Sequence, residues 1–124
     1  MIWAREQPAG LAPVTVLVLP VARRNMGFPA FVEHWTGPHA RLALGDPHAE
    51  ERLVRLEDTP SAAVPPAFRK TRYDGVGALT FASVQALAAS FTSDYYHEHL
   101  APDEQRFTEP LFSVAFLTQG MELR

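Results

Sequence analysis

The run from Val14 to Leu19 (VTVLVL) limits the possible folds more than any other part of the sequence. Its residues are β-branched or apolar almost without interruption, which is typical of a central strand with two buried faces. Successive side chains of a strand point to opposite sides, so both faces of such a sheet need cover. With 124 residues, the chain is long enough for one domain.

The rest of the chain changes its hydrophobic periodicity in a definite order. A helical pattern covers 28–44, and we expect a kink or break at Gly37-Pro38 because Pro38 has no N–H and crowds the preceding turn. Ser83 is a plausible N-cap for the next helix. The remaining predicted elements are strands at 52–57, 76–81 and 111–118 and helical segments at 84–91, 93–100 and 102–107. The order β-α-β-β-α-β predicts an α+β ferredoxin-like protomer, with a four-stranded antiparallel sheet and both helices on one face.

Two helices cover one face of such a sheet and leave the other open. The strand predicted at 111–118 is also apolar on both sides, so the open face needs a partner. A second copy of the chain, packed sheet against sheet, is the simplest one, and we predict a homodimer. We assign residues 1–13 to an N-terminal tail and residues 14–124 to the domain, with a proline-rich loop at 59–72.

Composition excludes several classes of function. The formal net charge is −3 and no basic run occurs, which argues against binding to nucleic acid. The chain has no cysteine, so disulfides, thiolate metal sites and a cysteine nucleophile are excluded. No apolar stretch is long enough to span a membrane, and the first residues lack the apolar core of a signal peptide. We therefore expect a cytoplasmic protein without a membrane partner.

His39 is the first candidate for chemistry. Phe31, Trp35 and His39 recur at spacings of four, so they share one stripe of the helix. An imidazole titrates near neutral pH and can accept or give a proton there. On the residues alone, a histidine that only braces the kinked helix is the favoured interpretation.

Two stretches of the chain resemble the EthD-like members of the dimeric α+β barrel proteins. The first is Phe31-x-x-x-Trp35-x-x-x-His39-Ala40. The second runs from Tyr73-Asp74-Gly75-Val76 through Phe81, Phe91 and Ser93-x-Tyr95 to Asp103-Glu104-x-x-Phe107. Together with the strand order they cover about residues 14–116.

The resemblance implies the ferredoxin-like protomer, the sheet-to-sheet dimer and a ligand cavity between sheet and helices. Relatives of this fold include cofactor-free monooxygenases, polyketide cyclases, decarboxylases, isomerases and haem-handling enzymes, so it implies no single reaction. Because the family motif ends on His39, a catalytic role for this residue becomes as plausible as a structural one.

Asp74 and Tyr95 are the other catalytic candidates. Asp74 opens a strand beside a glycine, where a carboxylate usually bonds to nearby backbone N–H groups, and its alternative role is to orient His39. Adjacent residues of a helix point about 100° apart, so one of Tyr95 and Tyr96 should face inward. The family pattern favours Tyr95, whose phenol could polarise a substrate oxygen; a plain core tyrosine is the alternative.

Aromatic residues are mostly core residues, yet some must line a cavity if one exists. We expect substrate contacts from Phe31, Trp35, Phe81, Tyr96 and Phe112. A metal site is not expected, because His34 and His39 are five apart, about 140° around an α-helix, and no His-Glu-x-x-His motif occurs. The chain has no nucleophile elbow and no phosphate-binding glycine loop, so we expect no cofactor, with haem as the remaining alternative.

These observations predict a small homodimeric enzyme that acts without a cofactor on an aromatic, polyketide-like or lactone compound. It would act by proton transfer, as a cyclase, decarboxylase or isomerase, or by oxygenation of a phenol. The alternative is a non-catalytic accessory or carrier protein that binds a small apolar metabolite. Replacement of His39 distinguishes the two, because only the enzyme depends on this imidazole for turnover.

Overall fold

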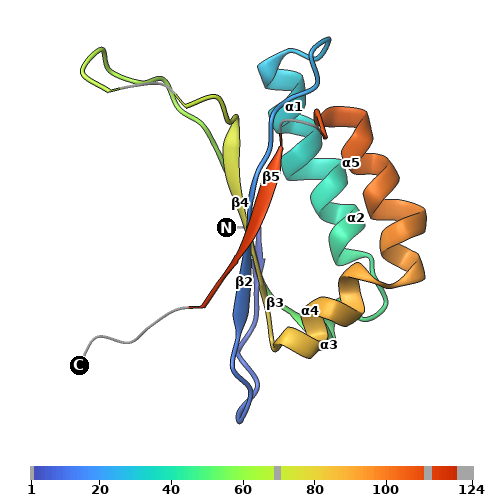
Figure 1. Ribbon diagram of the computed structural model, residues 1–124. Helices are drawn as coiled ribbons and strands as arrows, with labels where there is room; N and C mark the ends of the chain where they lie inside the picture. The colour runs from blue at the N-terminus through green and yellow to red at the C-terminus, as the bar shows by residue number, and fades with distance from the viewer. Residues whose placement is uncertain (1, 69–70, 111–112, 120–124) are drawn as a thin grey trace.

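The computed structural model describes residues 2–68, 71–110 and 113–119, and helices cover one face of its antiparallel sheet (Figure 1). The strands lie in the order β1-β3-β4-β2-β5. Their bounds are β1 Trp3–Ala4, β2 Val14–Leu19, β3 Leu53–Pro60, β4 Gly75–Phe81 and β5 Val114–Thr118. All neighbouring strands pair antiparallel. The expected α+β ferredoxin-like fold is therefore confirmed.

The sheet has five strands, so the expected number of four was wrong. The additional strand is β1, which lies within the segment 1–13. Trp3 pairs with Leu56 and Ala4 with Arg55, at the outer edge of β3. A strand of two residues is too short to show a period in the sequence, and only its hydrogen-bonding partner reveals it.

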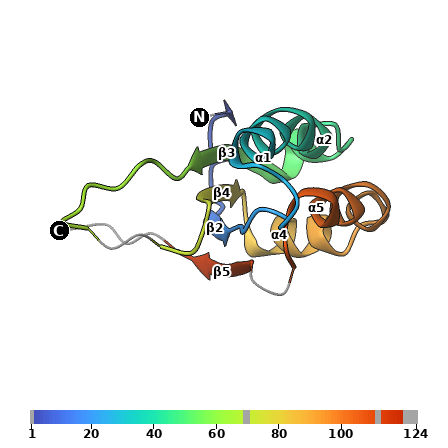
Figure 2. The same cartoon turned by 90° about the horizontal axis from the view of Figure 1, so that it is seen from above.

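The helical segments all lie on the same side of the sheet (Figure 2). They are α1 Phe28–His34, η1 Trp35–His39, α2 Ala40–Leu44, α3 Ala49–Arg52, α4 Val84–Phe91, η2 Tyr96–Leu100 and α5 Ala101–Phe107. Ser83 caps α4 as expected, since its Oγ accepts a hydrogen bond from the backbone N–H of Ala86 at 3.1 Å. Within the described ranges, no helix has both the length and the apolar character needed to cross a membrane.

The boundaries differ from expectation at three strands, of which β4 begins only one residue earlier than expected, at Gly75. The short helix α3 was not predicted and includes Arg52, so β3 begins one residue later than expected and continues to Pro60. The last strand was expected from Leu111 and is observed from Val114, while residues 111 and 112 lie outside the described part. Ends of elements are less well marked in a sequence than their centres.

The helix at Gly37-Pro38 does not break. It continues as the π-helical segment η1, with Pro38 inside it, between α1 and α2. Pro38 has no N–H to donate to the residue four positions earlier, and a π-helical turn accommodates this by closing i to i+5 hydrogen bonds instead. A second π-helical segment, η2, ends two residues before Pro102.

The two faces of the sheet differ in their cover. Val16 pairs with Leu79 on one side and Leu117 on the other, and it is only 5% exposed beneath the helices. Leu17 points to the opposite face, beside Phe116 of the edge strand β5. No described segment packs over this second face as the helices do over the first (Figure 2).

Glycines let Trp35 approach the sheet. A Cβ atom at Gly75 would lie 2.6 Å from Trp35 Cζ3, and one at Gly77 would lie 3.2 Å from Trp35 Cζ2. The same atom at Gly77 would lie 3.3 Å from Oδ1 of Asp58. The glycines at 75 and 77 thus permit close packing of a helix on the strand. Trp35 and Asp58 occupy the space they leave.

Candidate functional site

A cavity of about 490 Å³ lies between the sheet and the helices. Its lining is mostly apolar and comes from both layers, with Val16 and Phe81 from the strands and Trp35 and Phe107 from the helices. Cavities of this size bind small molecules and use a few placed polar groups for orientation. Five titratable side chains line it: His39, Asp46, Asp58, Tyr96 and Glu104.

His39 is held by a buried carboxylate. Its Nδ1 donates to Oδ2 of Asp103 at 2.7 Å. His34 donates to the same carboxylate through Nε2, at 2.9 Å to Oδ2 and 3.1 Å to Oδ1. Asp103 is 4% exposed, so its two imidazole partners take the place of water. With Nδ1 occupied, the neutral imidazole of His39 keeps Nε2 as a free acceptor beside the cavity.

Burial and hydrogen bonding set the charges of this group. Burial lowers the pKa of His39, and the contacts with Asp103 only partly oppose this effect. Burial by itself would raise the pKa of Asp103, but the hydrogen bonds from His39 and His34 outweigh it and lower the pKa. At neutral pH the site therefore contains a neutral His39 and an ionised Asp103, the states that a base and its orienting group need.

The π-helical turn brings the two histidines together. His34 ends α1 and His39 ends η1, and five residues of an α-helix would separate them by about 140°. A π-helical turn holds about one residue more, so residues five apart come to the same side. The expectation that His34 and His39 diverge was wrong for this reason. The ring of Phe107 packs against both imidazoles, with centroids 4.9 Å and 4.8 Å away.

A second polar group faces the same cavity. The hydroxyl of Tyr96 donates to Oε2 of Glu104 at 3.1 Å. Burial, assisted by the negative charge of Asp103, raises the pKa of Glu104 to about 7. Burial and the neighbouring Glu104 raise the pKa of Tyr96 to about 12. On the sheet side, burial raises the pKa of Asp58 to about 7.

The sequence matches the EthD domain over residues 23–111, which is well over half of the chain. The chain belongs to the EthD family. No curated protein matches the sequence significantly.

Solved structures share the fold at low sequence identity. An ethyl tert-butyl ether D (EthD) family protein from Bacillus halodurans C-125 is 16% identical, with a TM-score of 0.68 over 88% of this chain and 99% of that one. SnoaB, a cofactor-independent oxygenase from Streptomyces nogalater, is 12% identical, with a TM-score of 0.62 over 90% and 96%. A dimeric protein of unknown function and ferredoxin-like fold from Bacteroides fragilis is 9% identical, with a TM-score of 0.60 over 87% and 96%.

In this EthD-family protein, Asp74 and Tyr95 lie away from the cavity lining. Oδ2 of Asp74 accepts a hydrogen bond from the backbone N–H of Ala22 at 2.7 Å. The Tyr95 hydroxyl donates to the carbonyl oxygen of Leu42 at 2.6 Å. Both side chains thus tie backbone segments together, and the group that orients His39 is Asp103. A catalytic role for Asp74 or Tyr95 stays a prediction from the sequence.

The residues expected to contact substrate divide into three groups. Trp35, Phe81 and Tyr96 line the cavity. Phe31 is 0% exposed and packs behind it, on Trp35 and Phe107. Phe112 lies outside the described residues. Of the adjacent tyrosines, Tyr96 is the one that faces the cavity.

Sequence reasoning missed Asp103, His34 and Glu104 as site residues. Asp103 and Glu104 stand in the family motif, but in the sequence they are the acidic first turn of a helix, a common surface feature. Asp103 lies 64 residues from His39, so only the packing of α5 against η1 joins them. Among residues 2–68, 71–110 and 113–119, no group of three or more His, Asp or Glu side chains is arranged to hold a metal ion.

Proposed function

We propose that this EthD-family protein is a small enzyme that removes a proton from a bound aromatic, polyketide-like or lactone compound, with His39 as the base. One observation carries the proposal: His39 lines the cavity while its Nδ1 is held by the buried carboxylate of Asp103. A buried carboxylate in this position selects the tautomer with Nε2 free and stabilises the imidazolium that forms when Nε2 takes a proton.

The apolar walls of the cavity support a substrate of this class. Trp35, Phe81 and Phe107 offer flat surfaces to a ring, and the few polar groups can bind a carbonyl or hydroxyl oxygen. The chemistry we propose needs no dissociable cofactor, because a carbanion or phenolate formed in an apolar site is itself reactive. Such an anion can rearrange, cyclise onto a carbonyl group of the same molecule or reduce oxygen. Oxygenation is the variant named for the structural neighbour SnoaB.

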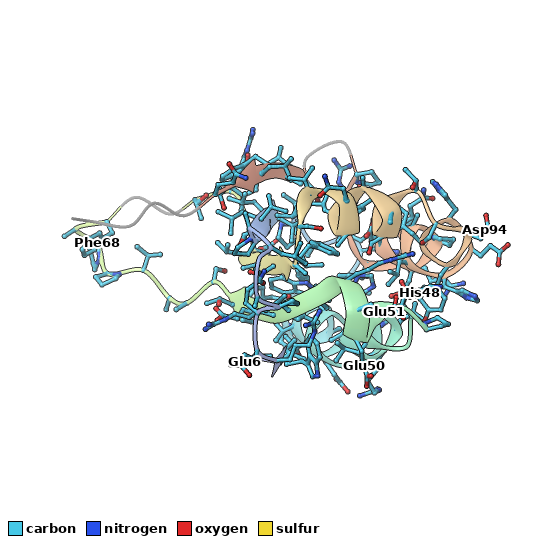
Figure 3. The ribbon with its side chains drawn as sticks, turned by 90° about the horizontal axis from the view of Figure 1, so that it is seen from below. Glu6, His48, Glu50, Glu51, Phe68 and Asp94 are labelled. Atoms are coloured by element: carbon cyan, nitrogen blue, oxygen red, sulfur yellow. The ribbon has the colours of Figure 1, made fainter. Side chains whose placement is uncertain are left out.

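We also propose that the protein is a homodimer joined through the open face of the sheet. Ala78, Leu17 and Phe116 lie side by side across β4, β2 and β5 on this face. The proline-rich stretch 61–68 projects beyond the sheet on the side away from the helices (Figure 2) and carries Phe68 far from the helical layer (Figure 3). A second copy would cover both features.

A thermal-shift screen with phenols, quinones, lactones and small aromatic acids tests the function. A ligand that binds only the folded protein raises Tm, and a tighter ligand raises it further at the same concentration. We expect hits whose shift depends on pH in the range where His39 titrates, and we expect turnover of some hits by mass spectrometry. His39→Gln should abolish turnover and the pH dependence while hits still bind.

His48→Gln is the matched control. His48 is an exposed histidine on the outer surface near α3 (Figure 3), where it pairs with Glu51 at 3.6 Å. The His48→Gln variant should bind ligands and turn them over as the unchanged protein does. Ligand binding without turnover, and with the same pH dependence in His39→Gln, would contradict the enzyme and favour a carrier of small apolar metabolites. An absorbance scan of the purified protein checks for haem.

A further inference from the structure

Glu104 and His39 face one cavity from neighbouring helical segments. Glu104 lies on α5, directly after Asp103, whose carboxylate binds the His39 imidazole. Consecutive residues of a helix point about 100° apart, so this turn sends one carboxylate towards the histidines and the next into the cavity lining. Tyr96 binds Oε2 of Glu104, and the second carboxyl oxygen remains for a ligand.

The pKa values of the two adjacent carboxyl groups are shifted in opposite directions. Two imidazole donors hold Asp103 in its ionised form, so its pKa is lowered. Burial raises the pKa of Glu104 to about 7, and the charge on Asp103 adds to the effect. Titratable groups whose surroundings push their pKa values apart are typical of acid and base pairs in active sites. Here the carboxylic acid and the neutral imidazole coexist at neutral pH.

We propose that Glu104 is the general acid that works with His39, and that the substrates are carbon acids with an oxygen that gains negative charge as the C–H bond breaks. Enolisable ketones and lactones belong to this class. The proposal rests on the proposed role of His39 as base. It adds a second catalytic residue and a requirement on the substrate: its C–H and its oxygen must reach the two groups together.

The proton balance of the step is simple. His39 Nε2 takes the proton from carbon, and the C–H electron pair forms the new C=C bond. The former carbonyl π pair accepts the proton of the Glu104 carboxyl group. The product is the neutral enol, and the protein is left with an imidazolium and a carboxylate, which exchange protons with the product or with solvent in the return step.

Four other titratable groups face Glu104 or share its cavity besides His39. Tyr96 donates to it from η2, Asp103 repels its charge from α5, and Asp46 and Asp58 line the cavity from the α2–α3 connection and from β3. Activity needs neutral His39 and protonated Glu104, so the rate should rise with pH through the pKa of His39 and fall above about 7. Tyr96→Phe removes a hydrogen-bond donor that favours the ionised form of Glu104, so the pKa of Glu104 should rise. In this variant, the fall in rate at alkaline pH should therefore move to higher pH.

Benzisoxazoles are suitable probes, because a base removes the C3 proton, the electron pair forms a nitrile, the N–O bond breaks and the oxygen leaves as a phenolate. The 5-nitro compound has a leaving oxygen that needs little protonation, whereas the unsubstituted compound depends on an acid. In Glu104→Gln we expect a rate loss of about 100-fold for the unsubstituted probe and less than about 3-fold for the nitro probe. The exposed Glu98→Gln is the matched control.

The possible outcomes separate the two proposals. Base-dependent turnover that is lost in His39→Gln supports the proposed function whatever Glu104 does. Equal losses for both probes in Glu104→Gln, or an alkaline limb that persists in this variant, would overturn the role of Glu104. A rate loss confined to the unsubstituted probe in Asp58→Asn, and absent from Glu104→Gln, would assign the acid to Asp58. No turnover that depends on His39 would overturn both proposals.

Discussion

Replacing Glu104 by glutamine should change how the stability of the protein depends on pH. A free glutamate titrates near 4.5, and burial raises the pKa of Glu104 to about 7. A group whose pKa is raised in the folded state stabilises the fold fully below its unfolded pKa, and this contribution is lost as pH rises through the folded pKa. The unchanged protein should therefore lose stability between these two values. Glutamine is neutral throughout and should remove that loss.

The size of the effect follows from the two pKa values. The difference between about 7 and 4.5 corresponds to about 3 kcal/mol in the free energy of unfolding. This is an upper figure, because Glu104 keeps some contact with water. An isosteric amide keeps an oxygen to accept the hydrogen bond from Tyr96, so Glu104→Gln should cost little at acid pH.

Urea unfolding at a series of pH values measures this directly. We expect the stability of Glu104→Gln relative to the unchanged protein to rise by about 2–3 kcal/mol between about pH 4 and about pH 8.5. Glu98→Gln, at an exposed site, should show no such trend. Parallel pH profiles of Glu104→Gln and the unchanged protein would refute the argument that burial keeps Glu104 protonated.

Four further substitutions test, in turn, the carboxylate that holds both imidazoles, the packing of Trp35 on the sheet, the hydrogen bond of Tyr95 and the proposed dimer interface. Asp103→Asn leaves one oxygen for two imidazole donors, so the free energy of unfolding in urea should fall by about 2 kcal/mol. The pKa of His39, followed by NMR, should fall further because the contact with Asp103 raises it. An unchanged pKa would contradict this contact. Gly75→Ala places a Cβ 2.6 Å from the indole ring of Trp35 and should lower the free energy of unfolding in urea by about 1–3 kcal/mol. An unchanged stability would mean that the helix can shift away from the sheet without cost. Tyr95→Phe loses the hydrogen bond from the Tyr95 hydroxyl to the backbone, so the free energy of unfolding should fall by about 1 kcal/mol. The increase in Tm on ligand binding should be unchanged. A variant that keeps its stability but loses turnover would make Tyr95 a catalytic residue. Phe116→Asp should convert the proposed dimer into a monomer in analytical ultracentrifugation. A dimer that persists in this variant would contradict an interface on the open face of the sheet.

The fold could be predicted well from the sequence, because each main element carries a local pattern. Val14–Leu19 was predicted with the bounds that it has, and the Ser83 cap is where its residue type places it. The strand β1 was missed because its two residues show no periodicity of their own. These two residues form a strand because they pair with the open edge of β3.

The candidate site was predicted less completely. His39, Trp35 and Phe81 line the cavity, and the helix stripe and the family motifs pointed to them. Tyr96 also lines it, as expected for a substrate contact, whereas the family pattern favoured its neighbour Tyr95 for catalysis. Asp103 was missed, because a helix with an acidic first turn has the same sequence pattern whether it faces water or a pair of histidines.

The sequence by itself determined the order of strands and helices, the apolar cover of one sheet face and the place of a histidine on the inner stripe of a helix. These features depend on neighbours within a few positions along the chain. The tertiary structure decided which carboxyl group has a lowered pKa and which has a raised one. Asp103 and Glu104 are adjacent and chemically alike, yet one meets two imidazole donors and the other an apolar cavity. A pKa depends on the solvent and charges around a group, and folding alone supplies these.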